Sequence, residues 1–379
     1  MPAGPLGPPA SNSAPCVAGP CPLPAGSGTV PYMMKRLGYA LGMGLAGVAL
    51  LLPGLALDGA GAADAPGVQV TTVRYGPFTL PPAGRGGDVD HANVVMPDVA
   101  KPCENCFIVR AEPDLVYDDG SSANLDTGLM LHHAVFFNTG RPDTTCGKDT
   151  FFGRLGERFL ASGNERTVKR YPDGYGYHLG RDPVTGVFHI MNHSAETKRA
   201  WFTFKVTWRP DSTPGIRAVT PLWLDENNCR TSEYDAPAGP SAKHWTWTST
   251  VTGRIVSGGG HVHTGGVRTV LTNLTTGQRI CTSWAGYGHK PAYMGEIESM
   301  SYCAWDTLGV IRAGDTLDLE ADYDAAEPVP GAMGIMVMGL FETDDLTAGT
   351  PAPPDANGGV VPPSAGSPSP AGASHHGHH

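Results

Sequence analysis

Short apolar runs recur along the chain between residues 68 and 341, and clusters of Gly, Pro, Asp and Asn separate them. Such runs, rich in β-branched and aromatic residues and bounded by turn-forming residues, predict β-strands. A helical turn is expected within residues 151–161, and no other long segment has the apolar period of a helix. The predicted strands span residues 68–75, 106–109, 129–137, 187–192, 200–207, 245–249, 254–257, 261–274, 279–284, 316–323 and 333–341.

This pattern predicts an all-β protein made of two tandem antiparallel β-sandwich domains, jelly-roll-like in architecture. The turn-rich segment 209–215 marks the boundary between them. We therefore expect the first sandwich at residues 66–210 and the second at residues 211–346. Residues 347–379 are rich in Pro, Gly, Ser and His and are predicted to be a disordered tail.

The N-terminal part, residues 1–65, has the features of an extension followed by a secretory signal peptide. Lys35 and Arg36 precede an apolar run at residues 37–57, and small residues with A-x-A spacing follow at 60–65. This order predicts a signal peptide at about residues 33–65 and a secreted protein. A membrane anchor is the alternative, but Pro53 and the glycines of the run disfavour it, so no stable anchor is expected.

Composition narrows the classes of partner and predicts disulfides. The net charge is −10 and basic clusters are lacking, which argues against a nucleic-acid partner. An even number of cysteines follows residue 65, and in an exported chain this predicts disulfides. Cys103 and Cys106 are interpreted as structural, because no second C-x-x-C completes a zinc site. The pair expected first is Cys281–Cys303, which flanks a loop rich in Gly and Tyr; the other pairings stay open.

Two histidine pairs are candidate metal ligands. His261 and His263 are two residues apart, so on a strand both imidazoles project from one face, and the glycines around them permit close approach. His132 and His133 are adjacent, and on a regular strand they would face opposite ways. For both to bind one ion, the strand must bulge at this point.

Two further strands add soft or imidazole ligands. Alternation places Phe188 and Ile190 on one face of a strand, and His189, Met191 and His193 on the other. On a late strand, Met333 has the opposite parity to Met336 and Met338. At least one face of that strand must be core, and Met333 is the methionine that is available for another role.

The ligand types indicate copper. Imidazole suits copper, zinc and iron, whereas a thioether ligand favours Cu(I) over zinc. Carboxylates are scarce beside these histidines in sequence, which disfavours a site with two histidines and one carboxylate for iron. The sequence also lacks an H-E-x-x-H zinc motif, a G-x-S-x-G motif and a P-loop.

Between about residues 103 and 341 the chain resembles the copper type II, ascorbate-dependent monooxygenases, the group of peptidylglycine α-hydroxylating and dopamine β-monooxygenases. The resemblance rests on four motifs in the family's order. They are His132-His133 before Ala-Val-Phe-Phe, the stretch 174–180 followed by 188–193, His261-Val262-His263, and Met333.

The resemblance implies two sandwiches with one copper each, facing across a solvent-filled cleft. His132, His133 and His193 would hold the electron-transfer copper, with His189 as the rival to His193. The remaining ligands, His261, His263 and Met333, would hold the copper at which dioxygen reacts and a substrate C–H bond is hydroxylated. The implied cofactors are two copper ions per chain and a reductant such as ascorbate, and the implied partners are a small-molecule substrate and O₂.

The sequence also departs from the peptide-amidating members of that family. These members hold the substrate carboxylate with an Arg two residues before the H-x-H and with polar residues two and four positions after the methionine. Here the positions are Gly259, Ile335 and Val337. A carboxylate without a cationic partner would be poorly held, so we expect a substrate that is neutral or apolar near the reacting carbon. The family's cysteine after the methionine is Gly334 here, and Cys281 with Cys303 would take over its stapling role.

The leading hypothesis is thus a secreted dicopper monooxygenase. The alternative is an exported copper-binding or carrier protein without catalytic activity. A structural β-sandwich with incidental histidines is the third possibility, and it predicts no tight copper beyond the His-rich tail.

Overall fold

The computed structural model describes residues 67–84, 90–293 and 295–347. The predicted signal peptide and the predicted disordered tail lie outside these residues, apart from residue 347. Among the residues described, no helix is both long enough and apolar enough to cross a membrane.

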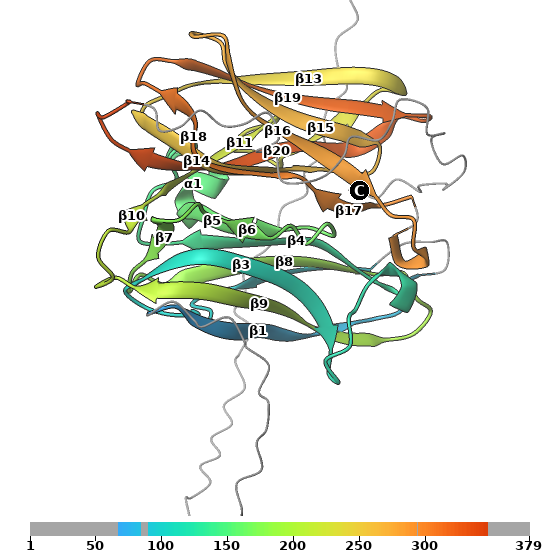
Figure 1. The fold of residues 1–379 in the computed structure, drawn as a ribbon. Coiled ribbons are helices and arrows are strands. Elements are labelled where there is room, and N and C mark those ends of the chain that lie inside the picture. Colours follow the sequence, from blue (N-terminus) through green and yellow to red (C-terminus); the bar gives the residue numbers. More distant parts are fainter. Residues whose placement is uncertain (1–66, 85–89, 294, 348–379) are drawn as a thin grey trace, which may run out of the picture. The chain divides into compact units, whose positions relative to one another are not determined.

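The fold is all-β, as predicted, and the described residues form twenty strands and three short helices (Figure 1). The helices are η1 (Leu125–Thr127), α1 (Phe151–Leu155) and η2 (Pro291–Tyr293). The first ten strands are β1 (Gln69–Leu80), β2 (Asp90–Met96), β3 (Cys106–Tyr117), β4 (Leu129–Asn138), β5 (Glu157–Ser162), β6 (Lys169–Arg170), β7 (Tyr175–Leu179), β8 (Val184–Asn192), β9 (Lys198–Pro210) and β10 (Arg217–Ala218). The others are β11 (Thr220–Asp225), β12 (Glu233–Ala236), β13 (Gly239–Thr248), β14 (Gly253–Val262), β15 (Gly266–Asn273), β16 (Gln278–Tyr287), β17 (Ile297–Met300), β18 (Tyr302–Ile311), β19 (Thr316–Ala325) and β20 (Val329–Glu342).

Strands β1 to β10 pair only among themselves and form two sheets. One has the order β1-β9-β3-β7-β10 with β6 beside β3, and the other has the order β2-β8-β4-β5. Strands β11 to β20 form the orders β11-β20-β14-β18, with β12 beside β20, and β13-β19-β15-β16-β17. Each pair of sheets encloses a core, so the described chain consists of two consecutive sandwiches, here called the first and the second sandwich.

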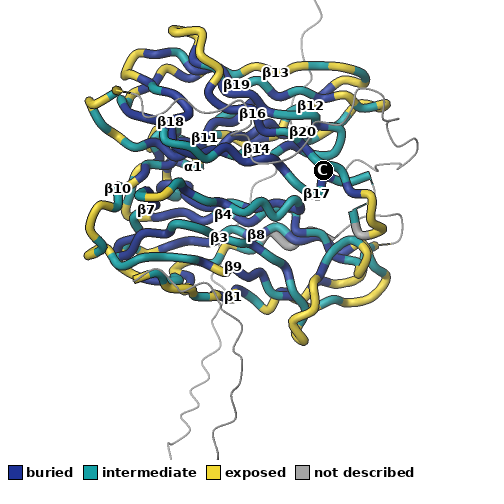
Figure 2. Tube along the Cα trace, viewed as in Figure 1, coloured by how far each residue is buried: buried dark blue, intermediate teal, exposed yellow. Residues whose placement is uncertain are grey.

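Side chains along the strands point alternately to the two faces of a sheet, and those on the inner faces fill these cores. Figure 2 shows that the central strands contain many buried residues. In the first sandwich, aromatic rings from both sheets meet, with centroids of Tyr75, Phe136 and Phe188 5.1–5.6 Å apart. In the second sandwich, Met336 and Met338 are fully buried in the core. The prediction that Met336 and Met338 face the core is therefore confirmed. Burial of such side chains stabilises the fold by roughly 1.5–3 kcal/mol each.

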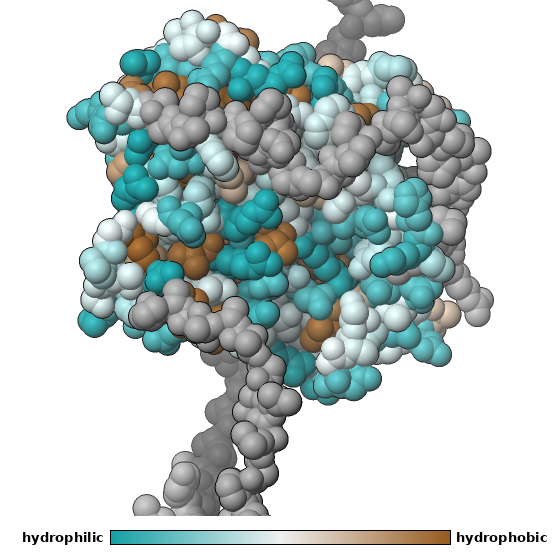
Figure 3. Space-filling view, viewed as in Figure 1, coloured by the Kyte–Doolittle hydropathy of each residue, from teal (hydrophilic) through white to brown (hydrophobic). Residues whose placement is uncertain are grey.

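A smaller apolar seam joins the two sandwiches. Trp223, Met333 and Ile335 of the second sandwich pack together, and Val135 and Ala161 of the first sandwich lie against them. Met333 therefore points away from the core of its own sandwich and towards the other sandwich, as its opposite parity to Met336 predicted. On the face drawn in Figure 3, apolar side chains form only small, separate patches among polar ones, which is ordinary for a protein surface.

Two predicted elements differ from the structure. The expected helical turn at residues 151–161 is a single turn, α1, because Gly156 ends it and β5 begins at Glu157. The expected strand at residues 261–274 is the end of β14 and the start of β15, with a turn between them. Gly265 has a φ of 92° in this turn, a conformation that glycine adopts without steric cost, and the apolar pattern alone did not reveal the break.

The cysteines of the described chain form three disulfides: Cys103–Cys106, Cys146–Cys229 and Cys281–Cys303. The predicted pair Cys281–Cys303 and the structural interpretation of Cys103 and Cys106 are confirmed. The bond Cys146–Cys229 was left open by the sequence, and it links the two sandwiches covalently.

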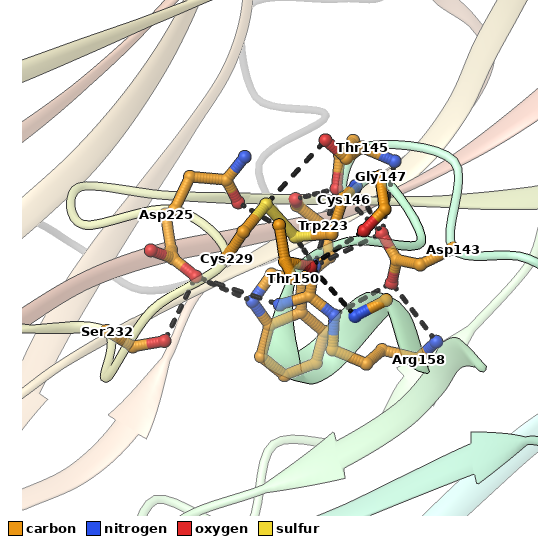
Figure 4. The surroundings of a disulfide bond; sticks show 12 residues. Asp143, Thr145, Cys146, Gly147, Thr150, Arg158, Trp223, Asp225, Cys229 and Ser232 are labelled. Carbon is orange, nitrogen blue, oxygen red and sulfur yellow. Dashed lines mark hydrogen bonds and ion pairs between the residues drawn. A yellow bond between two sulfur atoms is a disulfide. The ribbon is translucent and has the colours of Figure 1, made fainter. Parts of the chain in front are cut away.

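A buried arginine reinforces this link (Figure 4). The Arg158 side chain is 1% exposed, and its Nε lies 2.8 Å from Asp143 Oδ2 of the first sandwich. Its Nη1 lies 3.7 Å from Asp225 Oδ2 of the second sandwich, and its Nη2 donates to Cys146 Sγ at 2.8 Å. One cation thus pairs with carboxylates from both sandwiches beside the disulfide, as a buried charge requires.

Candidate metal centre

The β2-β8-β4-β5 sheet presents three histidines on the face opposite its core. Leu131 and Ala134 are fully buried in the core of the first sandwich, whereas His132 and His133 between them are partly buried outside it. The register of β4 against β8 shifts between Leu131 and His133. This irregularity is the bulge that the adjacent histidines were expected to require, and it sends both imidazoles to one side.

The third histidine on this face is His189, which pairs with His133 across β8 and β4. Its Nδ1 lies 2.8 Å from His132 Nδ1. Phe188 and Ile190 are buried in the core, so the predicted alternation along this strand is confirmed.

His193, the ligand favoured from the sequence, lies elsewhere. It follows β8 and is exposed, and it lines an open pocket of about 500 Å³ together with Tyr117, Leu125 and Lys198. Although His193 has the same parity as His189, four residues of strand separate them by about 13 Å. The structure therefore brings His189, and not His193, beside His132 and His133.

The second sandwich contributes His261, near the end of β14, and His263, just after it. His261 Nε2 lies 3.3 Å from His133 Nε2, and His263 Nε2 lies 3.3 Å from the same atom. The rings of His132 and His263 are 5.0 Å apart between centroids. The two histidine sets that the sequence placed at separate sites thus meet in one cluster between the sandwiches, which we call the five-histidine cluster: His132, His133, His189, His261 and His263.

The cluster contains two overlapping groups that could hold a metal ion. The first is His132, His133 and His189, and the second is His133, His261 and His263; within each group one ligand nitrogen per residue lies within 4.8 Å of the others. His133 belongs to both groups.

Hydrogen bonds to residues outside the cluster fix the tautomers of His261 and His263 in the second group. His263 Nδ1 lies 2.7 Å from the Gly331 carbonyl oxygen, and His261 Nδ1 lies 3.2 Å from Glu165 Oε1. Since both partners are acceptors, each Nδ1 carries a proton, and Nε2 of each ring is the nitrogen that faces His133.

Burial disfavours the protonated form of two of these imidazoles, those of His133 and His263. It lowers the pKa of His133 well below the usual value, and the nearby His132, His261 and His263 lower it further. Burial, followed by the effect of His261, lowers the pKa of His263 to about 3. His133 and His263 therefore have the unprotonated form that binds metal ions at neutral pH.

The residues fit a metal ion of the kind that imidazole binds. Nitrogen ligands at about 2.0–2.1 Å from a tetrahedral ion lie about 3.3–3.4 Å from one another, and the two Nε2 separations are 3.3 Å. Without a cation, lone pairs of His261 and His263 face one ring nitrogen that can carry a single proton. An all-imidazole donor set suits copper, zinc, iron or nickel.

The backbone of Met333 and the backbone of His263 are joined through one tyrosine side chain. Tyr323 Oη accepts hydrogen bonds from the backbone N–H of His263 at 2.9 Å and of Met333 at 3.1 Å, and it donates to the Met333 carbonyl. The Met333 side chain packs with Trp223 and Ile335 in the seam. Of the predicted ligand set His261, His263 and Met333, the last two are thus held by one tyrosine, and a Met333 bond to metal stays a prediction.

Another group with metal-ligand spacing lies in the second sandwich and comprises His244, Asp318 and Glu320. The His244 side chain is 53% exposed, and Arg268 already pairs with Glu320 at 3.3 Å. A cation already present beside the carboxylate makes this group a weak competitor for metal.

Comparison with known proteins relates the chain to one kind of enzyme. The probable copper-dependent oxygenase M1 of a Phoma species is 28% identical over 268 residues, which are 68% of this chain and 66% of that protein. The probable copper-dependent oxygenase clz3 of Cochliobolus lunatus is 27% identical over 227 residues, 57% of this chain and 71% of that protein. The chain thus spans about two thirds of the length of these relatives.

Two further similarities are more limited. Residues 223–343, which cover most of the second sandwich, match the family described as Stress up-regulated Nod 19. Among solved structures, the major capsid protein P2 of bacteriophage PM2 is similar with a TM-score of 0.29 and 8% identity, over 73% of this chain and 99% of that protein. This structural likeness is too low to support a conclusion.

Proposed function

We propose that the protein is a copper-dependent oxygenase whose metal is held by the five-histidine cluster. The observation that carries the proposal is the convergence of imidazoles from both sandwiches, with Nε2 atoms of His133, His261 and His263 at metal-ligand spacing. The names of the two fungal relatives support copper as the cofactor and dioxygen as a substrate.

Each residue would have a defined part. His133, His261 and His263 would hold one copper, and His132 with His189 would hold a second beside it, with Met333 as a further soft ligand. Bound copper would supply one-electron redox chemistry with dioxygen, driven by a reductant such as ascorbate. The sandwiches would exclude bulk water from the ions and fix the imidazole rings.

The substrate would be a small molecule that is neutral or apolar near the reacting carbon. Ile335 and Val337, which stand where the amidating enzymes have polar residues, lie in the apolar seam. This seam offers a substrate carboxylate no partner, so we expect hydroxylation of a C–H bond in an uncharged environment. The predicted signal peptide and the disulfides support a secreted protein.

The test is copper content per chain, measured on protein in which the tail histidines and His244 are replaced by alanine. We expect two copper ions in this background, a loss in the His189→Ala and His261→Ala variants, and full retention in His193→Ala, the matched control. Loss in His193→Ala with retention in His189→Ala would contradict the site.

Oxygen uptake with ascorbate then separates enzyme from carrier. Uptake coupled to a hydroxylated product supports the oxygenase, and efficient turnover of glycine-extended peptides would contradict the proposed substrate class. Tight copper without oxygen uptake would instead support an exported copper-binding or carrier protein.

A further inference from the structure

One carboxylate of the first sandwich contacts a candidate metal ligand of the second. Glu165 Oε1 lies 3.2 Å from His261 Nδ1, and the exposed fractions of the two side chains are 7% and 16%. His261 Nε2 faces His133 at the same time. The imidazole of His261 is therefore held between a carboxylate on one side and the five-histidine cluster on the other.

The loop that carries Glu165, residues 163–166 after β5, is fastened to both sandwiches. The Asn164 side chain donates to the Ile297 carbonyl of the second sandwich at 3.4 Å. Arg166 forms an ion pair with Asp114 and donates to the Ala123 carbonyl in the first sandwich. Glu165 is thus bracketed by two anchored neighbours, so its carboxylate is fixed relative to both sides of the cluster.

The space around the contact is closed. A Cβ atom at Gly163 would lie 2.4 Å from Glu165 Oε2 and 2.8 Å from His261 Cε1. The Gly163 N–H also lies 3.2 Å from Glu165 Oε1 and donates to it. Only a residue without a side chain lets the carboxylate approach the ring from this direction.

The chemistry of the carboxylate suits this position. An ionised carboxylate accepts hydrogen bonds only, so the facing nitrogen must be the donor. A proton is thereby kept on Nδ1 of His261, so Nε2 is the nitrogen that faces the five-histidine cluster.

We infer that Glu165 is a positioning residue for metal binding, which sets the tautomer and orientation of His261 and increases the basicity of its Nε2 atom. This inference rests on the proposed function for its purpose, but the contact between Glu165 and His261 does not depend on that function. Carboxylates in this role behind metal-bound histidines typically account for about 10- to 100-fold in metal affinity.

The first test uses metal-free protein and is independent of the proposed function. Long-range ¹H–¹⁵N spectra of the imidazoles should show His261 protonated at Nδ1 in the wild type. In Glu165→Ala this tautomer should no longer be fixed, and in Glu165→Gln, which keeps a side-chain acceptor, it should be partly retained. An unchanged His261 signal in Glu165→Ala would overturn the inference, whether or not the protein binds copper.

The second test measures Cu(II) affinity by chelator competition, together with the electron paramagnetic resonance spectrum. We expect a 10- to 100-fold loss in Glu165→Ala and a smaller loss in Glu165→Gln. The control is Glu157→Gln, which removes another buried carboxylate of the same region, one that accepts a hydrogen bond from Tyr177 at 2.6 Å; it should leave affinity unchanged. Unchanged affinity in Glu165→Ala would also overturn the inference. So would a carboxylate-oxygen ligand to Cu(II) that is seen in the wild-type spectrum and is lost in Glu165→Ala, because Glu165 would then bind the metal itself.

Discussion

At the scale of single residues, Glu226 is a buried carboxylate in an unfavourable environment. It follows β11, is 4% exposed, and lies against Gly334, where a Cβ atom would be 2.6 Å from its Cγ. Neither carboxylate oxygen has a hydrogen-bond partner within the described part of the chain. Burial raises the pKa of Glu226 to about 9; Lys243 opposes this shift, and the nearby carboxylates of Asp318 and Asp225 add to it.

This pKa predicts a pH-dependent stability. A carboxyl whose pKa is higher in the folded state than in the unfolded state favours folding at low pH, and its contribution is lost as pH rises from about 4.3 to about 9. Each pH unit in that window lowers the free energy of unfolding by up to about 1.4 kcal/mol. In Glu226→Gln this slope should disappear, so the variant should gain stability relative to wild type between pH 5 and pH 8. Urea unfolding at several pH values measures it, and parallel curves for the two proteins would contradict the prediction.

At the scale of elements, the glycine run of β14 allows the two sheets of the second sandwich to approach closely before the histidine pair. A Cβ atom at Gly260 would lie 2.2 Å from Thr269 Oγ1 and 2.9 Å from Ser283 Cβ, on β15 and β16 of the opposing sheet. The Gly260 N–H donates to Ser283 Oγ at 2.9 Å. These contacts fix the end of β14, from which His261 projects.

We therefore expect Gly260→Ala to lower the free energy of unfolding by about 1–3 kcal/mol, because overpacking forces neighbouring side chains from their positions. Gly147→Ala is the matched control, since a Cβ atom there meets nothing within 4 Å. Chemical denaturation of both variants checks the difference. Equal stability of the two would show that the sheets can separate without cost.

Periodicity in the sequence predicted the features of this molecule that are local to one strand. The faces on which Phe188, His189 and Met333 lie follow from alternation alone. For the adjacent pair His132-His133, the sequence predicted that both could bind one ion only if the strand bulges. The choice between His189 and His193 depends on which of them lies opposite His132 and His133 on the neighbouring strand. Alternation does not contain that information.

Contacts between the sandwiches were not predictable in the same way. Glu165 is 96 residues from His261 in the chain, and neither lies in a motif that refers to the other. The bond Cys146–Cys229, with a sequence separation of 83, likewise depends on how the sandwiches dock. The motifs therefore indicated the ligands, whereas their union in one cluster depends on three-dimensional packing.

At the scale of the whole molecule, the candidate metal centre depends on the docking of the two sandwiches. Its histidines come from β4 and β8 on one side and from β14 and the residue following it on the other. The apolar seam, the bond Cys146–Cys229 and the Arg158 ion pairs hold these sides together. Metal affinity and docking should consequently be coupled, because a ligand bound only by the docked form stabilises it.

The double variant Cys146→Ser/Cys229→Ser tests this coupling. Loss of the disulfide should lower the free energy of unfolding by about 2–4 kcal/mol and should also weaken copper binding. The comparison is Cys281→Ser/Cys303→Ser, which removes a bond inside the second sandwich and should lower stability with little effect on copper affinity. Thermal unfolding and chelator competition measure both quantities, and an equal loss of copper affinity in the two variants would contradict the coupling.

The distribution of ligands over both sandwiches also imposes an order in time. When the chain is synthesised from its N-terminus, the first sandwich can fold before residues 261 and 263 exist as part of a sheet. At that stage His132, His133 and His189 stand on a finished sheet without their partners. The group His132, His133 and His189 is complete at that stage, whereas the group His133, His261 and His263 is complete only after the second sandwich has folded and docked. We therefore expect the second group to take up a metal ion only in the finished chain.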